Sequence, residues 1–514
     1  MKKGQDFWAL LLIALLGLGT LALGLYHLTA YPAPWFDEGW YLHIARNLAR
    51  YGQYAVLSSE GFRYDDTALA VAPTLYLPIA LVFRLAGVGL LQARLVMVLY
   101  LLATVVALYL TARRLYGYPV AAAAAYLFLL QAEDDPFTAT LYLGRQAMGE
   151  IPALLFFLLG TLAFLRALEL PSRSPEASRE RPLPLSALVS GFLFGLAMVT
   201  KLQYVFFIPP ALLLTALVAH LFLRRPLWRP ALLALTAGLL TLAAWYGCLG
   251  LLVGRENLAA ILRGLSAASS PQVRVFSLHT IAQGGKFLLR SKFLVFGLPA
   301  LLYGFAQALR RDRRDTPTLF LGAFILTGLG WYVVASIGWP RYTYPFLAVG
   351  NIFIAWLLDD LGDGFHLHIR SPRFVRAIAV LLLLLLLPLA SFRLVARDIL
   401  SPPDSGYEAF TRAVWTTVPP GRVIETWEWE LTVVDEAHLY HLPPTPLLNN
   451  LIARVYFGAP ASPDDYPFLA FDPDYIAVGR FARWTGLYPP SVLEMCCRPV
   501  AAVGEYELFE VIRP

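Results

Sequence analysis

Eleven long apolar runs, each bounded by charged residues or proline, restrict what this sequence can fold into. The first extends from Phe7 to Leu28, and the others lie at about 92–112, 118–132, 146–168, 185–200, 203–223, 231–253, 287–309, 317–337, 342–358 and 374–394. A helix of about 20 apolar residues crosses the hydrocarbon core of a bilayer. Only 15% of the residues are charged, against about 25% in soluble domains. We therefore predict a polytopic α-helical membrane protein with about eleven spans.

Basic residues gather in the connections between these runs. They lie at Arg113-Arg114, between Arg166 and Arg181, at Arg224-Arg225 with Arg229, between Arg310 and Arg314, and between Arg370 and Arg376. Alternating spans place all five clusters on one side, which the positive-inside rule makes cytoplasmic, together with the N-terminal Lys2-Lys3. The clusters account for the net charge of +6, and none combines basic with aromatic residues as a nucleic-acid groove does. Nucleic acid is therefore not a predicted partner.

One further apolar segment, 71–86, conflicts with this alternation of sides. If it crossed the bilayer, residues 31–70 and the Arg113-Arg114 cluster would not lie on opposite sides. Pro73 and Pro78 interrupt the segment, and proline removes a backbone donor from a helix. We predict a juxtamembrane or re-entrant helix that does not cross.

The remaining sequence divides between the membrane and the outer face. Residues 1–395 are expected to form a transmembrane domain with outer loops at 31–70 and 254–286. Residues 396–514 are richer in charge and proline and contain short strand-like runs such as Arg422–Glu425 and Tyr475–Val478. They predict a small extracytoplasmic α/β domain. The adjacent Cys496 and Cys497 are interpreted as two free or half-buried thiols, with a strained disulfide between them as the alternative.

Two adjacent carboxylates follow the first span directly. Asp37 and Glu38 stand in Trp35-Phe36-Asp37-Glu38-Gly39, where aromatic neighbours at a membrane surface make two charges costly to hold. Such a pair indicates a cation, a general-base task, or both. The alternative is that both acids only complement the dipole of a helix that begins near Gly39.

Isolated charges mark three other places near the outer ends of spans. Glu150 lies just inside an apolar run, where an ionisable group suggests a functional site, although Arg145 could simply pair with it. Lys201 and Arg341 each separate two apolar runs. Cations on the outer side oppose the positive-inside bias, and a bound phosphate would account for them; snorkelling at a helix end is the alternative.

These motifs together resemble a known superfamily. The motifs are Trp35-Phe36-Asp37-Glu38-Gly39, Gly144-Arg145 followed by Glu150-Ile151-Pro152, Thr200-Lys201, and Arg341-Tyr342 before Tyr344-Pro345. Their order resembles the GT-C glycosyltransferases, most of all the branch with protein O-mannosyltransferases and the aminoarabinose transferases of lipid A. The resemblance extends over roughly residues 1–360.

The resemblance implies a hexosyl- or pentosyltransferase that moves a sugar from a polyprenyl-phosphate donor to a lipid, glycan or protein hydroxyl at the outer face. It assigns catalysis to Asp37, Glu38 and Glu150, with Asp37 as the base. Donor binding falls to Arg145, Lys201, Arg341, Tyr342 and Tyr344. Chemically, a carboxylate accepts the acceptor proton while cations stabilise the leaving phosphate.

A transporter or lipid-linked sugar flippase is the alternative, since buried charges among many spans serve that function too. It predicts inverted repeats, which the sequence does not show. Two or three carboxylates are too few to establish a metal site, so no cofactor is assigned and a divalent ion stays open. The sugar, acceptor and carrier length are not encoded in these motifs.

Overall fold

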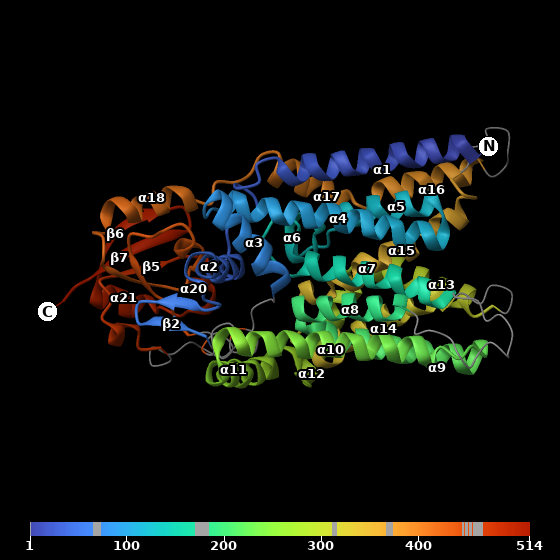
Figure 1. Ribbon diagram of the computed structural model, residues 1–514. Helices are drawn as coiled ribbons and strands as arrows, with labels where there is room; N and C mark the ends of the chain where they lie inside the picture. Colours follow the sequence, from blue (N-terminus) through green and yellow to red (C-terminus); the bar gives the residue numbers. More distant parts are fainter. Residues whose placement is uncertain are drawn as a thin grey trace.

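The computed structural model describes residues 2–64, 73–169, 185–310, 316–365, 374–444, 447, 451, 455 and 466–513. Most of them form a long bundle of helices, with a small sheet at one end (Figure 1). The N-terminus lies at the opposite end of the bundle from the sheet. The predicted basic clusters around 170–184, 311–315 and 366–373 fall largely outside the described residues.

The bundle contains helices of three kinds. Six elements are long and apolar enough to cross a membrane: α4 (Leu90–Tyr116), α7 (Glu150–Glu169), η4 with α9 (Leu202–Leu223), α10 (Trp228–Val253), α14 (Thr316–Ala335) and η6 with α15 (Pro340–Leu361). Two bent pairs also qualify: α12 (Leu278–Arg290) with η5 and α13 (Phe293–Ala308), and α16 (Phe374–Leu386) with α17 and η7 (Leu389–Ile399). Shorter apolar stretches lie in α1 (Lys2–Leu25), α3 (Pro73–Ala86), α5 (Tyr118–Leu129) and α8 (Leu185–Thr200).

Each of the eleven predicted apolar runs coincides with one of these elements, and the polytopic helical fold is confirmed. Among the described residues, however, six to eight helices rather than eleven are long and apolar enough to cross a membrane. The additional helix is α3, which has 14 residues and is about 21 Å long at 1.5 Å per residue. The hydrocarbon core is about 30 Å thick, so α3 is too short to cross it upright. Its buried face, with Leu75, Tyr76 and Ile79, packs against α2 (Phe36–Tyr51).

The expected outer loop 254–286 is mostly helical. It comprises α11 (Arg255–Val273) and the greater part of α12. Ser277 starts α12 by accepting a hydrogen bond from the main-chain N–H of His279 at 3.2 Å. This is a typical N-cap, which satisfies a donor that the first turn leaves free.

Beyond the bundle lies a mixed five-stranded sheet with the order β4-β3-β5-β7-β6. Its strands are β3 (Val423–Thr426), β4 (Leu439–His441), β5 (Tyr475–Val478), β6 (Cys497–Val503) and β7 (Tyr506–Val511). β3 is parallel to β4 and β5, and β7 is antiparallel to β5 and β6. Helices α18 (Tyr407–Thr417), α20 (Arg480–Thr485) and α21 (Pro490–Cys496) accompany it, which confirms the predicted α/β character. Cys496 and Cys497 form a disulfide where α21 meets β6, so the two-thiol interpretation was wrong.

Helix α2 lies between the bundle and the sheet (Figure 1). Phe36 stacks on Phe481 of α20 with 3.8 Å between ring centroids. A Cβ atom at Gly39 would overlap the main-chain nitrogen of Glu430, so only glycine permits this approach. The hairpin of β1 (Val56–Ser58) and β2 (Gly61–Arg63) extends the contact, because Ser59 donates its N–H to the carbonyl of Tyr440 at 2.8 Å.

Two buried acids lie at this junction, and their carboxylates differ in how fully they are hydrogen-bonded. Glu428 accepts main-chain N–H groups from Gly479 and Ala482, each at 2.9 Å. Glu430 accepts a hydrogen bond from the phenol of Tyr506 at 2.9 Å, while its other carboxylate oxygen is buried and has no hydrogen-bond partner among the described residues. Burial and the neighbouring Glu428 raise the pKa of Glu430 well above its usual range. We therefore infer that Glu430, rather than Glu428, keeps its proton in the folded protein.

Relative to the native protein, we expect Glu430→Gln to raise the melting temperature more at pH 8 than at pH 5. An acid whose pKa is raised on folding holds its proton while the unfolded chain releases it, so stability falls as pH rises above the ordinary glutamate pKa. Glutamine removes that penalty. Thermal unfolding of the purified protein between pH 5 and 8 measures it.

Glu428→Gln is the matched control, and we expect it to lower the melting temperature because an amide nitrogen would face main-chain donors. If the difference in melting temperature between Glu430→Gln and the native protein stayed constant across this pH range, the assignment of the proton to Glu430 would be contradicted.

Candidate active site

Asp37 begins the site at the first turn of α2. Its carboxylate forms an ion pair with the guanidinium of Arg341, which lies on η6 (Pro340–Thr343). Aromatic rings surround that guanidinium, with the Trp339 ring centroid 4.6 Å from its central carbon and the Phe137 centroid 5.9 Å from it. Both side chains of the pair remain 14% exposed, so solvent or a ligand can reach them.

A second ion pair joins the ends of two spans. Glu150 is the first residue of α7, and Lys201 follows α8. The amine of Lys201 lies 2.7 Å from a carboxylate oxygen of Glu150, and the two side chains are 9% and 3% exposed. Burial this deep makes each charge depend on the other, because an unpaired ion in this environment is costly.

The two ion pairs share one neighbourhood. Tyr41, one turn after Asp37 on α2, is buried at the same place. Burial and the Asp37 carboxylate raise the pKa of the Tyr41 phenol, and the charges of Arg341 and Glu150 act on it as well. The structure therefore brings together Asp37, Glu150, Lys201 and Arg341. The first and last of these are about 300 residues apart in the sequence.

Tyrosines form much of the wall of this site. Tyr342 is 3% exposed and packs against Trp339 with 5.6 Å between ring centroids. The hydroxyl of Tyr344 lies 3.2 Å from that of Thr140. Tyr204 is also buried, and its hydroxyl has no hydrogen-bond partner within the described residues.

Glu38 points away from Asp37 into a separate buried network. Arg94 of α4 binds both of its oxygens, at 2.9 and 2.6 Å, and the N–H of Ala147 donates to it at 3.0 Å. Arg94 also donates to the carbonyl of Leu28 at 2.7 Å. This bidentate pair fixes the end of α1, the start of α2 and the loop before α7 relative to one another.

Arg145 likewise binds main chain rather than an acid. Its guanidinium donates to the carbonyls of Tyr31 at 3.0 Å, Tyr26 at 2.7 Å and His27 at 3.0 Å. These carbonyls lie at and beyond the C-terminal end of α1, where a helix leaves acceptors unsatisfied. Arg145 therefore does not pair with Glu150, which is the alternative that its spacing suggested.

Three residues in the site or in the network beside it escaped the sequence analysis. Arg94 is a lone cation within an apolar run, a signal that could have marked it as the partner of a buried acid. Tyr41 and Tyr204 carry no such signal, because buried tyrosines are common in membrane bundles. Among the described residues, no three His, Cys, Asp or Glu side chains converge as metal ligands.

The comparisons with known proteins agree with this architecture. Residues 70–247, about a third of the chain, match the model of the Dolichyl-phosphate-mannose-protein mannosyltransferase family. ArnT from Cupriavidus metallidurans, bound to undecaprenyl phosphate, superimposes with a TM-score of 0.61 at 16% identity, covering 98% of this chain and 97% of that chain. The chain shares the fold of this structure.

Two structures from Archaeoglobus fulgidus share this fold as well. Its apo oligosaccharyltransferase has a TM-score of 0.64 at 13% identity, with 93% of this chain and 70% of that chain covered. The archaeal oligosaccharyltransferase AglB, in complex with an inhibitory peptide and a dolichol-phosphate, has a TM-score of 0.61 at 14% identity, with 99% and 75% covered. No curated protein matches the chain in a sequence search.

Proposed function

We propose that the protein is a membrane glycosyltransferase that moves a sugar from a polyprenyl-phosphate donor to an acceptor hydroxyl at the extracytoplasmic face. The observation that carries the proposal is the convergence of two carboxylate–cation pairs, Asp37–Arg341 and Glu150–Lys201, at the sheet side of a GT-C bundle. The similar proteins support the donor class, because ArnT was solved with undecaprenyl phosphate and AglB with a dolichol-phosphate.

Asp37 is the proposed base. Its carboxylate is the more exposed of the two acids in the ion pairs, so an acceptor can approach it. The acceptor hydroxyl loses its proton to Asp37 while its oxygen bonds to the anomeric carbon, and the bond from that carbon to the phosphate oxygen breaks. General-base assistance of this kind contributes about 10²–10⁴-fold in rate.

Lys201 and Arg341 are the proposed phosphate ligands. In the structure each cation is paired with a carboxylate, so the donor phosphate must compete with Glu150 and Asp37. When Arg341 turns to the phosphate, Asp37 is released to accept a proton. Donor binding thus prepares the base, which limits proton abstraction to the loaded enzyme.

Glu38, Arg145, Tyr342 and Tyr344 take supporting roles in this proposal. Glu38 holds α2 in place through Arg94, and Arg145 holds the end of α1, so both position Asp37 rather than touch substrate. Tyr342 and Tyr344 form the wall beside the phosphate. A divalent ion could approach Asp37 or Glu150 only by displacing their cations.

The test of the function is to incubate the purified protein with a panel of radiolabelled polyprenyl-phosphate hexoses and pentoses, together with a membrane extract that supplies lipid, glycan and protein acceptors. We expect at least one donor to be consumed, with release of polyprenyl phosphate. Failure to consume any donor by protein that is folded and monodisperse would overturn the proposal.

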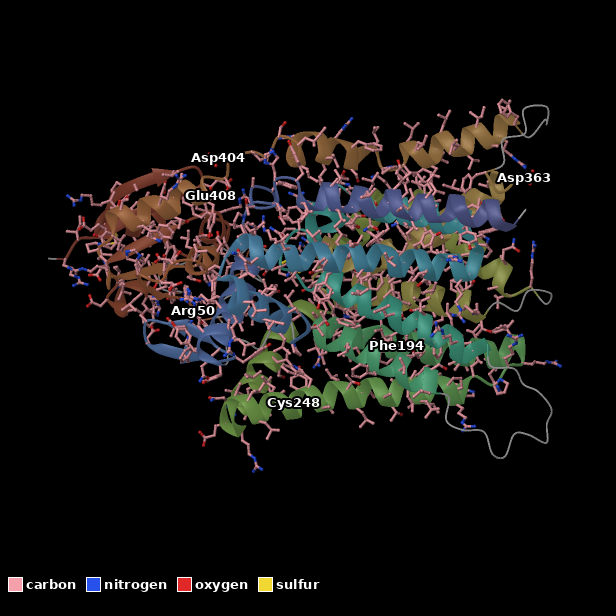
Figure 2. The ribbon with its side chains drawn as sticks, turned by 45° about the horizontal axis from the view of Figure 1, so that its top comes forward. Arg50, Phe194, Cys248, Asp363, Asp404 and Glu408 are labelled. Atoms are coloured by element: carbon pink, nitrogen blue, oxygen red, sulfur yellow. A yellow bond between two sulfur atoms is a disulfide. The ribbon has the colours of Figure 1, made fainter. Side chains whose placement is uncertain are left out.

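The proposed orientation places the N-terminus in the cytoplasm and the sheet outside. Asp363 and Glu408 lie at opposite ends of the molecule (Figure 2), and both are exposed. In a background without Cys248, Cys496 and Cys497, we expect an impermeant thiol reagent to label Glu408→Cys but not Asp363→Cys in intact cells. The reverse pattern would invert the topology.

A further inference from the structure

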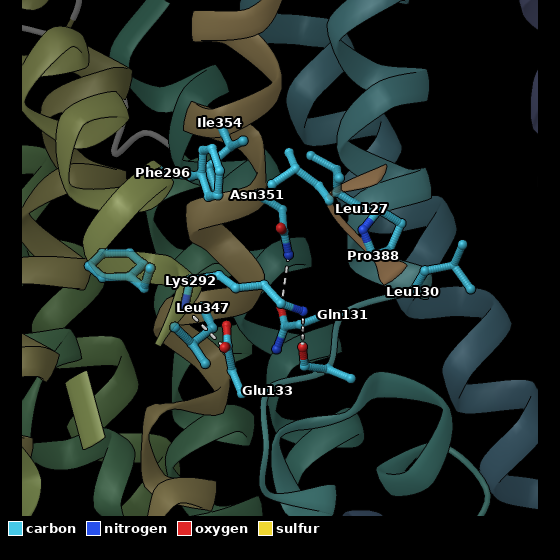
Figure 3. Close-up of a pocket in the computed structure, with 13 residues that line it drawn as sticks. Leu127, Leu130, Gln131, Glu133, Lys292, Phe296, Leu347, Asn351, Ile354 and Pro388 are labelled. Atoms are coloured by element: carbon cyan, nitrogen blue, oxygen red, sulfur yellow. Dashed lines mark hydrogen bonds between the residues drawn. The ribbon is translucent and has the colours of Figure 1, made fainter. Parts of the chain in front are cut away.

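A small cleft in the bundle is lined by none of the four charged residues of the proposed active site. It lies where the end of α5, η5 (Phe293–Gly297), α15 and the break between α16 and α17 meet (Figure 3). Asp37, Glu150, Lys201 and Arg341 do not line it. Its walls are apolar and include Leu127, Phe296, Ile354, Leu387 and Pro388.

The inner surface of the cleft is polar, unlike its walls. The Asn351 amide donates to the side-chain oxygen of Gln131 at 2.8 Å, and Gln131 donates to the carbonyl of Thr138 at 3.0 Å. Both amides are 8% exposed. Asn351 uses its nitrogen in this bond, so its side-chain oxygen stays available as an acceptor. Asn351 lies seven residues after Tyr344, the start of α15, and is thus about 10 Å along the helix.

A carboxylate and an amine complete the polar surface. Glu133 accepts the main-chain N–H of Lys292 at 3.0 Å, and the Lys292 amine donates to the carbonyl of Ala132 at 2.7 Å (Figure 3). Neither side chain forms an ion pair with another residue of the described chain, although both line the cleft. Two opposite charges therefore lie side by side with hydrogen-bonding capacity to spare.

Exposed aliphatic side chains surround the cleft. Leu386 and Leu389, on either side of Leu387 and Pro388, are 59% and 50% exposed, and Val295 beside Phe296 is 61% exposed. Exposed aliphatic residues on a spanning helix contact acyl chains. A charged pair that opens toward lipid is costly without a ligand.

We propose that this cleft binds the headgroup of a zwitterionic phospholipid with a primary ammonium, such as phosphatidylethanolamine. The ammonium donates to Glu133 and to the side-chain oxygen of Asn351, while Lys292 binds the phosphate. The acyl chains remain outside against Leu386, Leu389 and Val295.

Size and charge favour this ligand over other lipids. The cleft has a volume of about 50 Å³, and on this measure one water needs about 10–15 Å³. It accommodates a few headgroup atoms. Glu133 opposes an anionic lipid, and a quaternary ammonium cannot donate a hydrogen bond.

The test uses the full-length protein in nanodiscs with equal amounts of phosphatidylethanolamine, phosphatidylcholine and phosphatidylglycerol. Native mass spectrometry after ejection from the disc identifies the lipid that stays bound. We expect about tenfold preference for phosphatidylethanolamine over phosphatidylcholine, as one charge-assisted hydrogen bond provides. This readout does not depend on sugar transfer.

Three variants make the result specific. Glu133→Gln should remove the preference, and Ile354→Trp should block the cleft without changing its charges. Glu256→Gln, the same chemical change at an exposed acid of α11, should retain the preference. Equal retention of the three lipids by the native protein, preference for phosphatidylglycerol, or an unchanged preference in both cleft variants would overturn the proposal.

Discussion

Asp37→Asn should reduce sugar transfer by about 10²–10⁴-fold, the contribution of a general base, while the protein still folds and inserts. Asparagine keeps the size of the side chain and an oxygen that can accept from Arg341, but it cannot take the acceptor proton. Single-turnover rates with the donor identified in the panel provide the measurement. Donor affinity should stay the same or improve, because Arg341 is no longer held by a carboxylate.

Two control variants separate chemistry from folding. Asp404→Asn changes an exposed acid near the sheet (Figure 2) and should leave transfer unchanged. Glu38→Gln breaks the bidentate pair with Arg94, so it should lower thermal stability as well as activity, since it leaves a buried guanidinium without its counter-ion. Near-normal turnover by well-folded Asp37→Asn would exclude Asp37 as the base.

Lys201→Ala should also have a large effect, and it should lower both the stability of the protein and the rate of sugar transfer. Lys201→Ala leaves Glu150 charged and unpaired at 3% exposure, which costs about 3–5 kcal/mol for a buried pair. It also removes a cation from the leaving phosphate, a loss of about 10²–10³-fold in transfer. The single variant alone therefore cannot distinguish a structural role from a role in donor use.

The double variant Glu150→Gln with Lys201→Met makes that distinction. Removing both charges should restore most of the thermal stability, because a neutral pair in a buried position is nearly isoenergetic with an ion pair. Transfer should remain about 10²–10³-fold below the native protein, with weaker donor binding. Recovery of transfer together with stability would show that Lys201 serves only to neutralise Glu150.

Asp37 and Glu38 illustrate the limit of local sequence information. They are adjacent on one helix and were predicted to work together, yet a helix turns by about 100° per residue, so the two carboxylates point to different partners. Asp37 meets Arg341 and Glu38 meets Arg94. Sequence alone marked the acids, but their partners depended on how α4 and η6 pack against α2.

Arg145 shows the same limit from the other direction. Its position five residues before Glu150 suggested a local pair, but the guanidinium binds carbonyls that follow α1, more than a hundred residues earlier. A lone arginine near a span end carries no information about which distant acceptors lie within its reach. The Gly39 contact with Glu430 is equally non-local, because the sheet residues that require it lie in a separate part of the chain.

The sequence by itself determined the membrane-embedded helical fold, the approximate limits of the spans and the presence of Asp37, Glu150, Lys201 and Arg341. Bilayer thickness and the cost of unsatisfied backbone groups act on any chain in lipid, so these features follow from hydropathy and length. Tertiary structure decided which acid meets which cation, where the sheet docks on α2 and where the lipid-facing cleft forms. Ion pairs extend over only a few ångströms, and helix packing alone brings residues so distant in sequence within that range.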